Sequence, residues 1–212
     1  GTKGTDDWTN GNIEVTAAIA DSAKATQYAN AGYTLMIGDN TNYTSFTHEG
    51  NNPVLFETNG TIYAVLMDSS KQVGGSASQA IEKIDKKVPT GTVAVTANKS
   101  NSATVTVTAT DTAGNGSGAS GIEYYYYKMD NGSWSDAKTT NTFTFEGITQ
   151  GSTHTYYAKI VDKAKNEKEI NTGSSTAVTI ADLVAEDITF TLNYTGTKGT
   201  DDWTNGNIEV TA

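Results

Sequence analysis

Residue types that could carry out covalent or acid–base chemistry are scarce in this chain of 212 residues. It contains two histidines, His48 and His154, and no cysteine, so a cysteine nucleophile and a thiolate zinc site are excluded. Catalysis needs a nucleophile beside a base, or a matched acid and base. Neither histidine lies in a recognised motif, and we expect both at the surface, near a strand start and a turn. No pair of acids is marked out for glycoside hydrolysis. We therefore predict that the chain is not an enzyme and has no catalytic residues.

Oxygen ligands for a hard cation are abundant, and extracellular modules often bind Ca²⁺ weakly through such groups. Candidate ligands occur in one loop and in both connectors between predicted domains: Asp111, Asn115, Ser117, Asp85, Asp182, Glu186 and Asp187. None of these stretches matches the EF-hand loop, which ends in a bidentate glutamate. Asx turns at strand ends explain the same residues without a metal. The sequence therefore predicts no cofactor and no metal ligand, and weak Ca²⁺ binding stays open as the alternative.

Four consecutive tyrosines at residues 124–127 could form a platform for a sugar, because exposed aromatic rings stack on pyranose faces. Side chains alternate between the two faces of a strand, so either Tyr125 and Tyr127 or their neighbours point away from the core. Together with Trp134, in NGSWS, these two tyrosines are the candidate ligand-binding residues. The alternative is that the tyrosines form ordinary cross-strand aromatic pairs and that the tryptophan closes one end of a domain.

Charge excludes two classes of partner. The chain has 14 basic residues, all of them lysine, against 24 acidic ones, which gives a net charge of −10. Without arginine, and with this net charge, binding to nucleic acid is not expected, and an anionic membrane surface would repel the chain. No stretch of this sequence is apolar enough to insert into a membrane. We expect any export signal or anchor to lie outside it.

Strict alternation of apolar and polar residues, typical of half-buried strands, recurs along the chain, whereas helical spacing is almost absent. In residues 12–19, for example, Ile13, Val15 and Ala17 share one face. The alternation predicts strands at residues 12–19, 33–37, 61–67, 103–109, 121–129, 142–148 and 153–161. Clusters of Gly, Asn, Asp and Ser between them are typical of turns. This pattern predicts an all-β fold of antiparallel sandwiches.

Internal repeats divide the chain further. Residues 1–17 recur unchanged as residues 196–212, an offset of 195 residues. A fainter match lies within that period: AIEKIDKKVPTGTVAVTA superposes on AVTIADLVAEDITFTLNY at an offset of 97 residues, from Ala80 to Ala177. Each of these stretches has the pattern of a last strand, a connector and a first strand. We therefore predict two divergent copies of one seven-strand plan in each period.

The predicted domains follow from the connectors. Residues 1–87 form a sandwich that lacks its first strand, residues 88–183 form a second sandwich, and residues 184–212 supply the first two strands of the next copy. The missing first strand has the sequence ITFTLNY, which occurs at residues 188–194. We expect these boundaries if the sequence is a segment of a longer array that repeats every 195 residues.

Four segments carry a family resemblance: WTNGNIEVTA, IDKKVPTGTVAVTA, TDTAGNGSGASGIEYYYYKMDNGSW and YYAKIVDKAKNE. They resemble the immunoglobulin-like tandem repeats of large bacterial cell-surface and adhesin-type proteins, and the resemblance covers essentially the whole chain. It implies immunoglobulin-like β-sandwiches. One departure is Lys165, which stands where the family often has glycine.

The resemblance also implies a function. We expect a stalk, spacer or fibre shaft of an extracellular, surface-bound protein, in which the partners are neighbouring repeats and stiff modules add length linearly. Two alternatives stay open. One is an adhesive module that binds a glycan or a protein, and the other is a filament subunit that donates residues 188–194 to a neighbouring copy by β-strand addition.

Overall fold

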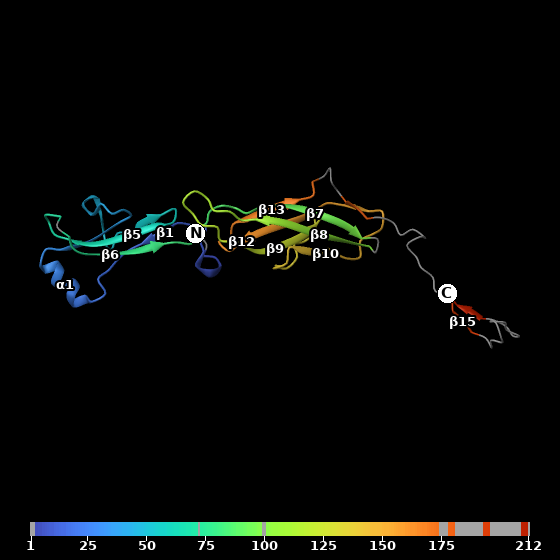
Figure 1. Cartoon of the computed structure of the whole chain (residues 1–212), viewed down its shortest axis with the longest axis horizontal. Helices are drawn as coiled ribbons and strands as arrows, with labels where there is room; N and C mark the ends of the chain where they lie inside the picture. The colour runs from blue at the N-terminus through green and yellow to red at the C-terminus, as the bar shows by residue number, and fades with distance from the viewer. Residues whose placement is uncertain are drawn as a thin grey trace, which may run out of the picture.

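A computed structural model describes residues 3–71, 73–98, 101–173, 178–180, 193–195 and 209–211. The described chain is mostly antiparallel β-structure, as the sequence predicts, and it has a sandwich-like architecture. Two β units follow one another along the chain and lie end to end (Figure 1). We call residues 3–85 the first unit, in which residues 82–85 form the connector, and residues 86–180 the second unit.

The first unit has a larger sheet in the order β3-β2-β5-β6 and a smaller sheet of β1 and β4. The strands are β1 (Ile13–Val15), β2 (Thr34–Gly38), β3 (His48–Glu49), β4 (Val54–Phe56), β5 (Gly60–Met67) and β6 (Val73–Ile81). Ile37 and Ile62 of the larger sheet pack with Phe56 of the smaller one and with Ile84 of the connector. A second cluster, around Phe46, covers the opposite face of the larger sheet.

A helix, α1 (Ser22–Asn30), interrupts the first unit where the sequence predicts no helix. Asp21 caps it by accepting hydrogen bonds from the backbone N–H groups of Ala23 and Lys24. The helix buries none of its residues and is short, so the apolar residues at helical spacing, Ala25, Tyr28 and Ala29, give only a weak helical period. Strand β1 ends at Val15 instead of continuing to residue 19. Two short 3₁₀ turns, η1 (Thr5–Asp7) and η2 (Tyr43–Ser45), complete the unit.

The second unit packs two three-stranded sheets face to face, in the orders β10-β8-β7 and β13-β12-β9, and β11 pairs with β14 at one edge. The strands are β7 (Thr90–Asn98), β8 (Ser102–Thr110), β9 (Ile122–Met129), β10 (Thr142–Phe145), β11 (Thr153–His154), β12 (Tyr156–Asp162), β13 (Glu167–Asn171) and β14 (Val178–Thr179). The core between the sheets includes Val105, Tyr127, Tyr156 and Ile160, all within 1% of full burial.

Near the C-terminal end, β15 (Asn193–Thr195) pairs with β16 (Glu209–Thr211), with Tyr194 opposite Val210. Because residues 196–212 repeat residues 1–17, Val210 is the counterpart of Val15 in β1. Of the predicted strand at 188–194, residues 188–192 lie outside the described residues. Within the described chain no helix has the length and apolar character needed to cross a membrane.

Candidate functional site

The junction between the two units is closely bonded. Backbone hydrogen bonds link them at several points: the Thr5 N–H donates to the Lys163 carbonyl at 2.9 Å, the Asn59 N–H to the Gly116 carbonyl at 2.7 Å, and the Gly118 N–H to the Ile84 carbonyl at 3.0 Å. Lys163 Nζ also lies 2.8 Å from a carboxylate oxygen of Asp6. The two units therefore meet in a specific arrangement that involves both backbones.

Three aspartates converge beside this junction. Asp85 lies in the connector, Asp111 follows β8, and Asp162 is the last residue of β12. Each offers a carboxylate oxygen, and these oxygens all lie within 4.8 Å of one another. Asp85 and Asp162 are fully buried, whereas Asp111 is partly exposed. We call these three residues the carboxylate cluster.

Backbone and amide donors position the cluster. Asp85 accepts hydrogen bonds from the backbone N–H groups of Lys87, at 3.0 Å, and of Ser120, at 2.8 Å. The amide of Asn166 donates to a carboxylate oxygen of Asp162 at 2.8 Å and to the backbone carbonyl of Asp85 at 2.9 Å. Asn166 thus holds the connector against the end of β12.

Asp111 is less completely bonded than its two neighbours. Its Oδ2 accepts a hydrogen bond from the Gly121 N–H at 2.6 Å. Its Oδ1 is buried and has no hydrogen-bond partner among the described residues. Buried polar atoms are normally hydrogen-bonded, so this oxygen indicates a missing partner.

The electrostatics of the cluster disfavour three negative charges. Burial raises the pKa of the Asp111 carboxyl above its ordinary value, and the nearby Asp85 charge raises it further, against the lowering effects of the Gly121 N–H, the Ser120 side chain and the Thr112 backbone. Burial likewise raises the pKa of Asp162, and Asp85 and Asp111 add to the rise against the hydrogen bonds from Asn166. Among the described residues no lysine or histidine forms an ion pair with any of the three.

Sequence reasoning identified part of this site. It named Asp85 and Asp111 as possible cation ligands but did not name Asp162, which reads as the end of a strand. Of the other named residues, Asn115 is exposed and Ser117 is partly buried, while Asp182, Glu186 and Asp187 lie outside the described residues. The sequence signal near Asp162 is Lys165, which stands where the resembled family often has glycine. In the structure the φ of Lys165 is 71°, in the left-handed region that favours glycine. This tight turn returns Asn166 to Asp162.

His154 forms an arrangement that resembles a catalytic triad. Its Nδ1 lies 2.7 Å from Asp130 Oδ2, and its Nε2 lies 2.7 Å from Ser152 Oγ. The Ser152 hydroxyl also donates to the backbone carbonyl of Thr149, so its single proton is already engaged and the serine is not set up as a nucleophile. Asp130 Oδ1 accepts from the Thr155 N–H at 2.8 Å. We interpret the group as a clamp between two loops. His154 is more buried than the sequence predicts, with a side chain 19% exposed.

The predicted aromatic site does not form as a platform. Tyr127 is 1% exposed, and its hydroxyl donates to the Thr140 carbonyl at 3.1 Å. Tyr125 packs against the same core and lies opposite Ile160 of β12. Both rings lie on the inner face of β9, against the core. Their placement therefore does not support the choice of Tyr125 and Tyr127 as ligand-binding residues. Trp134 is partly exposed beside Lys128, whose Nζ lies 4.6 Å from the centre of its ring.

The outer face of β9 and β12 instead alternates aromatic and lysine side chains. Lys128 Nζ lies 4.8 Å from the centre of the Tyr157 ring, and Lys159 Nζ lies 4.7 Å from that of Tyr126. These cation–π contacts cover the rings with charged ends and stabilise the sheet surface.

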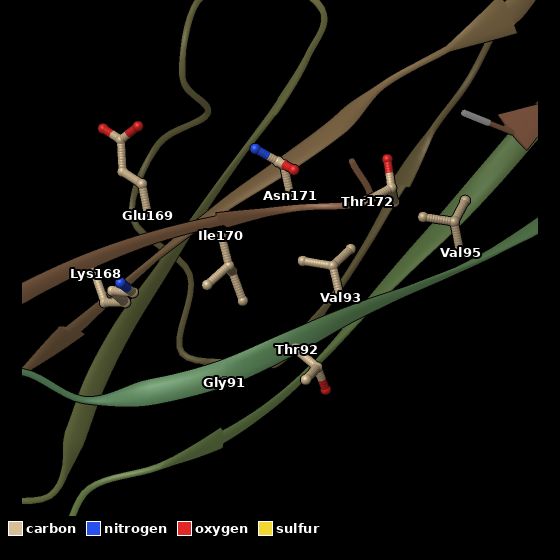
Figure 2. Close-up of a pocket in the computed structure, with 9 residues that line it drawn as sticks. All are labelled: Gly91, Thr92, Val93, Val95, Lys168, Glu169, Ile170, Asn171 and Thr172. Atoms are coloured by element: carbon tan, nitrogen blue, oxygen red, sulfur yellow. The ribbon is translucent and has the colours of Figure 1, made fainter. Parts of the chain in front are cut away.

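A groove in the second unit lies between the edge strands β7 and β13 and has a volume of about 700 Å³. In Figure 2, Val93 of β7 and Ile170 of β13 point toward one another across this space. Lys168 and Glu169 are its charged lining residues, and neither belongs to a cluster of possible metal ligands in the described chain. The groove is the side on which the two sheets remain open.

Comparisons with known proteins place the chain in no family. No family model matches the sequence, and no curated protein matches it. Among solved structures, a chain of a cytokine receptor complex (crystal form 1A) is similar, with 12% identity, a TM-score of 0.35, and coverage of 85% of this chain and 96% of that chain. A likeness this distant carries no argument about function.

Proposed function

We propose that the chain is a spacer or fibre-shaft segment of a large extracellular surface protein of bacteria, built from immunoglobulin-like sandwiches that repeat every 195 residues. The observation that carries this proposal is the junction: two β units lie end to end (Figure 1) and are joined by backbone hydrogen bonds and not by a slack linker. Stiff modules joined in this way extend a chain in proportion to their number.

The sheet orders support a repeated plan. In the second unit β8 lies between β10 and β7, and in the first unit β1, which corresponds in sequence to β8, pairs with β4, the counterpart of β10. The opposite sheets also correspond, with β2-β5-β6 in the first unit and β9-β12-β13 in the second. The strand β3 is an addition at the edge of the first unit.

The spacer proposal is tested by small-angle X-ray scattering on this chain and on a chain lengthened by one 195-residue period. We expect the maximum dimension to increase by the length of two further units, and a compact scattering profile would contradict the proposal. Gly4→Ala should widen the distribution of shapes, because a Cβ at Gly4 would lie 1.8 Å from the Lys163 carbonyl oxygen. Gly75→Ala is the matched control, since no heavy atom lies within 4 Å of the position that a Cβ at Gly75 would take.

A specific observation also favours strand addition as a second candidate function. β16, the sequence counterpart of β1, pairs with β15, whereas β1 pairs only with β4 among the described residues. A strand with the sequence of residues 188–194 therefore fits the other edge of β1. Analytical ultracentrifugation tests this function: we expect concentration-dependent oligomers that a peptide of residues 186–195 disperses. A chain that stays monomeric at every concentration measured would argue against it.

A further inference from the structure

We propose that Asn115 is a site of spontaneous deamidation and that its conversion loosens the junction between the two units. This inference goes beyond the spacer proposal and does not depend on it. The dipeptide Asn-Gly occurs five times in the chain, and four of these sites lie in the described residues, at Asn10, Asn59, Asn115 and Asn131. Asparagine is a thermolabile residue, and it is most reactive before glycine, which has no Cβ to hinder attack by its backbone nitrogen. Since the dipeptide is the same at all four sites, the fold decides which one reacts.

The reaction needs only the chain and water. The backbone nitrogen of Gly116 attacks the side-chain carbon Cγ of Asn115, and the new C–N bond closes a five-membered succinimide ring. The bond from Cγ to Nδ2 breaks, and Nδ2 leaves as ammonia with the proton that the Gly116 nitrogen gives up. Water then opens the ring at either carbonyl and yields aspartate or isoaspartate. No oxidant or reductant takes part, and the product carries a negative charge that asparagine lacks.

The turn at Asn115 leaves both reacting groups free. Asn115 and Gly116 are its central residues, and the Ser117 N–H closes it by donating to the Gly114 carbonyl at 3.3 Å. Both central residues are exposed. Within the described part of the chain, neither the Asn115 side chain nor the Gly116 N–H has a hydrogen-bond partner. No hydrogen bond of these two groups has to break before the ring can close.

Two of the other sites are held by hydrogen bonds. Asn59 is half-buried, and its Oδ1 accepts from the Ile84 N–H at 2.9 Å. Asn10 is also half-buried, and its amide donates to the Lys165 carbonyl at 3.4 Å. The Gly11 N–H, which would have to attack Asn10, donates to a threonine hydroxyl at 3.0 Å. Ring closure at either site therefore requires local opening of the structure.

The fourth site is intermediate. Asn131 and Gly132 are both exposed, but the Gly132 N–H donates to the Met129 carbonyl at 3.0 Å. The attacking nitrogen is therefore engaged in the turn that follows β9. We expect Asn131 to react more slowly than Asn115 and faster than the two half-buried asparagines.

Conversion of Asn115 would act on the junction. The Gly116 carbonyl accepts a hydrogen bond from the Asn59 N–H of the first unit at 2.7 Å. The φ of Gly116 is 70°, in the left-handed region that favours glycine, and a Cβ here would lie 3.0 Å from the Thr58 Cβ. The reactive glycine is thus required where the two units touch. Isoaspartate adds a methylene to the main chain directly before Gly116, so the carbonyl moves and its bond to the first unit is lost.

The rates are tested by peptide mapping with mass spectrometry on the full chain, incubated at mildly alkaline pH. We expect the change of amide to acid at Asn115 at least about tenfold faster than at Asn10 and Asn59, because a held site reacts only while it is open. The chain unfolded in urea is the control, and there the four rates should be similar. Asn115→Gln should remove the fast reaction, because its longer side chain must close a less favourable six-membered ring. Asn131→Gln, the matched change, should leave the fast reaction in place.

The effect on the junction is tested by hydrogen exchange. The converted chain can be separated by anion exchange because it carries the additional negative charge. In that fraction the Asn59 N–H should exchange at least about tenfold faster than in the fresh chain. The Asn115→Gln variant, aged in the same way, should keep the exchange rate of the fresh chain.

Three results would overturn the inference. If Asn115 reacts no faster than Asn131, the free nitrogen of Gly116 does not control the reaction. If the four rates keep the same order in the urea-unfolded chain, the neighbouring sequence and not the fold sets them. If the Asn59 N–H is as protected after conversion as before it, deamidation does not loosen the junction.

Discussion

Both β units bury a core between two sheets, but they differ in the number of strands in one of these sheets. In the second unit β7 adds a third strand beside β8 and packs against β12 and β13, and the core cluster there, which includes the fully buried Ile160, has more buried residues than either described cluster of the first unit. In the first unit the smaller sheet has two strands among the described residues. An apolar groove of about 280 Å³ remains open there, lined in part by Ile19, Leu35 and Leu66. The second unit has an open groove of its own, between β7 and β13, so the difference teaches that the third strand enlarges the buried core without closing the edge of the sandwich.

The largest expected effect is on the stability of the second unit, which has the larger core cluster. Ile160→Ala removes a fully buried side chain between the sheets of the second unit and should cost about 2–5 kcal/mol of unfolding free energy. Ile62→Ala, the matched change in the first unit, should cost nearer the lower end because Ile62 belongs to a smaller cluster and keeps 6% exposure, whereas Ile160 has none. Guanidinium unfolding, followed by hydrogen exchange resolved for each unit, measures both. Equal costs would remove the contrast between the two cores.

A smaller effect is expected at the boundary between the units. Asn166→Ala removes the amide that bonds both Asp85 and Asp162, and leaves buried acceptors without a donor, at a cost of about 1–3 kcal/mol. The loss should appear as faster hydrogen exchange on both sides of the junction. Asn131→Ala, at an exposed position, should have no such effect. If exchange rises only within the second unit, Asn166 stabilises that unit and not the boundary.

Adding a third strand beside β1 in the first unit should reduce the difference in stability between the two units. A chain with residues 181–195 placed ahead of Gly1 should pair that strand with β1 in the register of β15 with β16. Each new cross-strand pair contributes roughly 0.2–1 kcal/mol, so the first unit should gain on the order of 1 kcal/mol. Differential scanning calorimetry should show its transition move upward while that of the second unit stays in place. A scrambled leader of the same composition is the control.

The smallest effect concerns the loop clamp of the second unit. The hydrogen bond from His154 lowers the pKa of the Asp130 carboxyl below its ordinary value of 3.8, and the Thr155 N–H adds to the shift. Since the folded-state pKa is the lower one, the stabilisation is present above pH 3.8 and is lost as the pH falls through the folded-state value. The carboxylate is largely solvent-accessible, so the contribution is a few tenths of a kcal/mol, about that of a surface pair.

Asp130→Asn should flatten this part of the stability profile below pH 4, measured by urea unfolding at a series of pH values. The first unit has no counterpart of this clamp among its described residues, so its profile should not change. An unchanged profile for the second unit would show that the clamp contributes nothing to stability.

Most strands were predictable because half-buried strands alternate visibly. The strand at residues 102–110 differs from its predicted bounds by one residue at each end, and the strand at residues 122–129 by one residue at its start. Strands β3, β4 and β13 were not predicted: β3 and β4 are very short, and β13 is mostly charged. Of β6, which is rich in small residues, only the end near Ala80 was predicted, as a last strand. Helix α1 was not predicted because no side chain of it is buried. Alternation identifies strands with one buried face and carries little information about exposed or short elements.

The sequence by itself determined the all-β character of the chain, through period-two alternation, and the identity of residues 1–17 with residues 196–212, through direct comparison. Only the tertiary structure decided which face of β9 is buried, because either face of four consecutive tyrosines could have met the core. It alone joined Asp85, Asp111 and Asp162, because carboxylates from three distant segments meet only when two sheets and a connector are packed together. Alternation is a local property of the chain, whereas the carboxylate cluster depends on how separate segments pack.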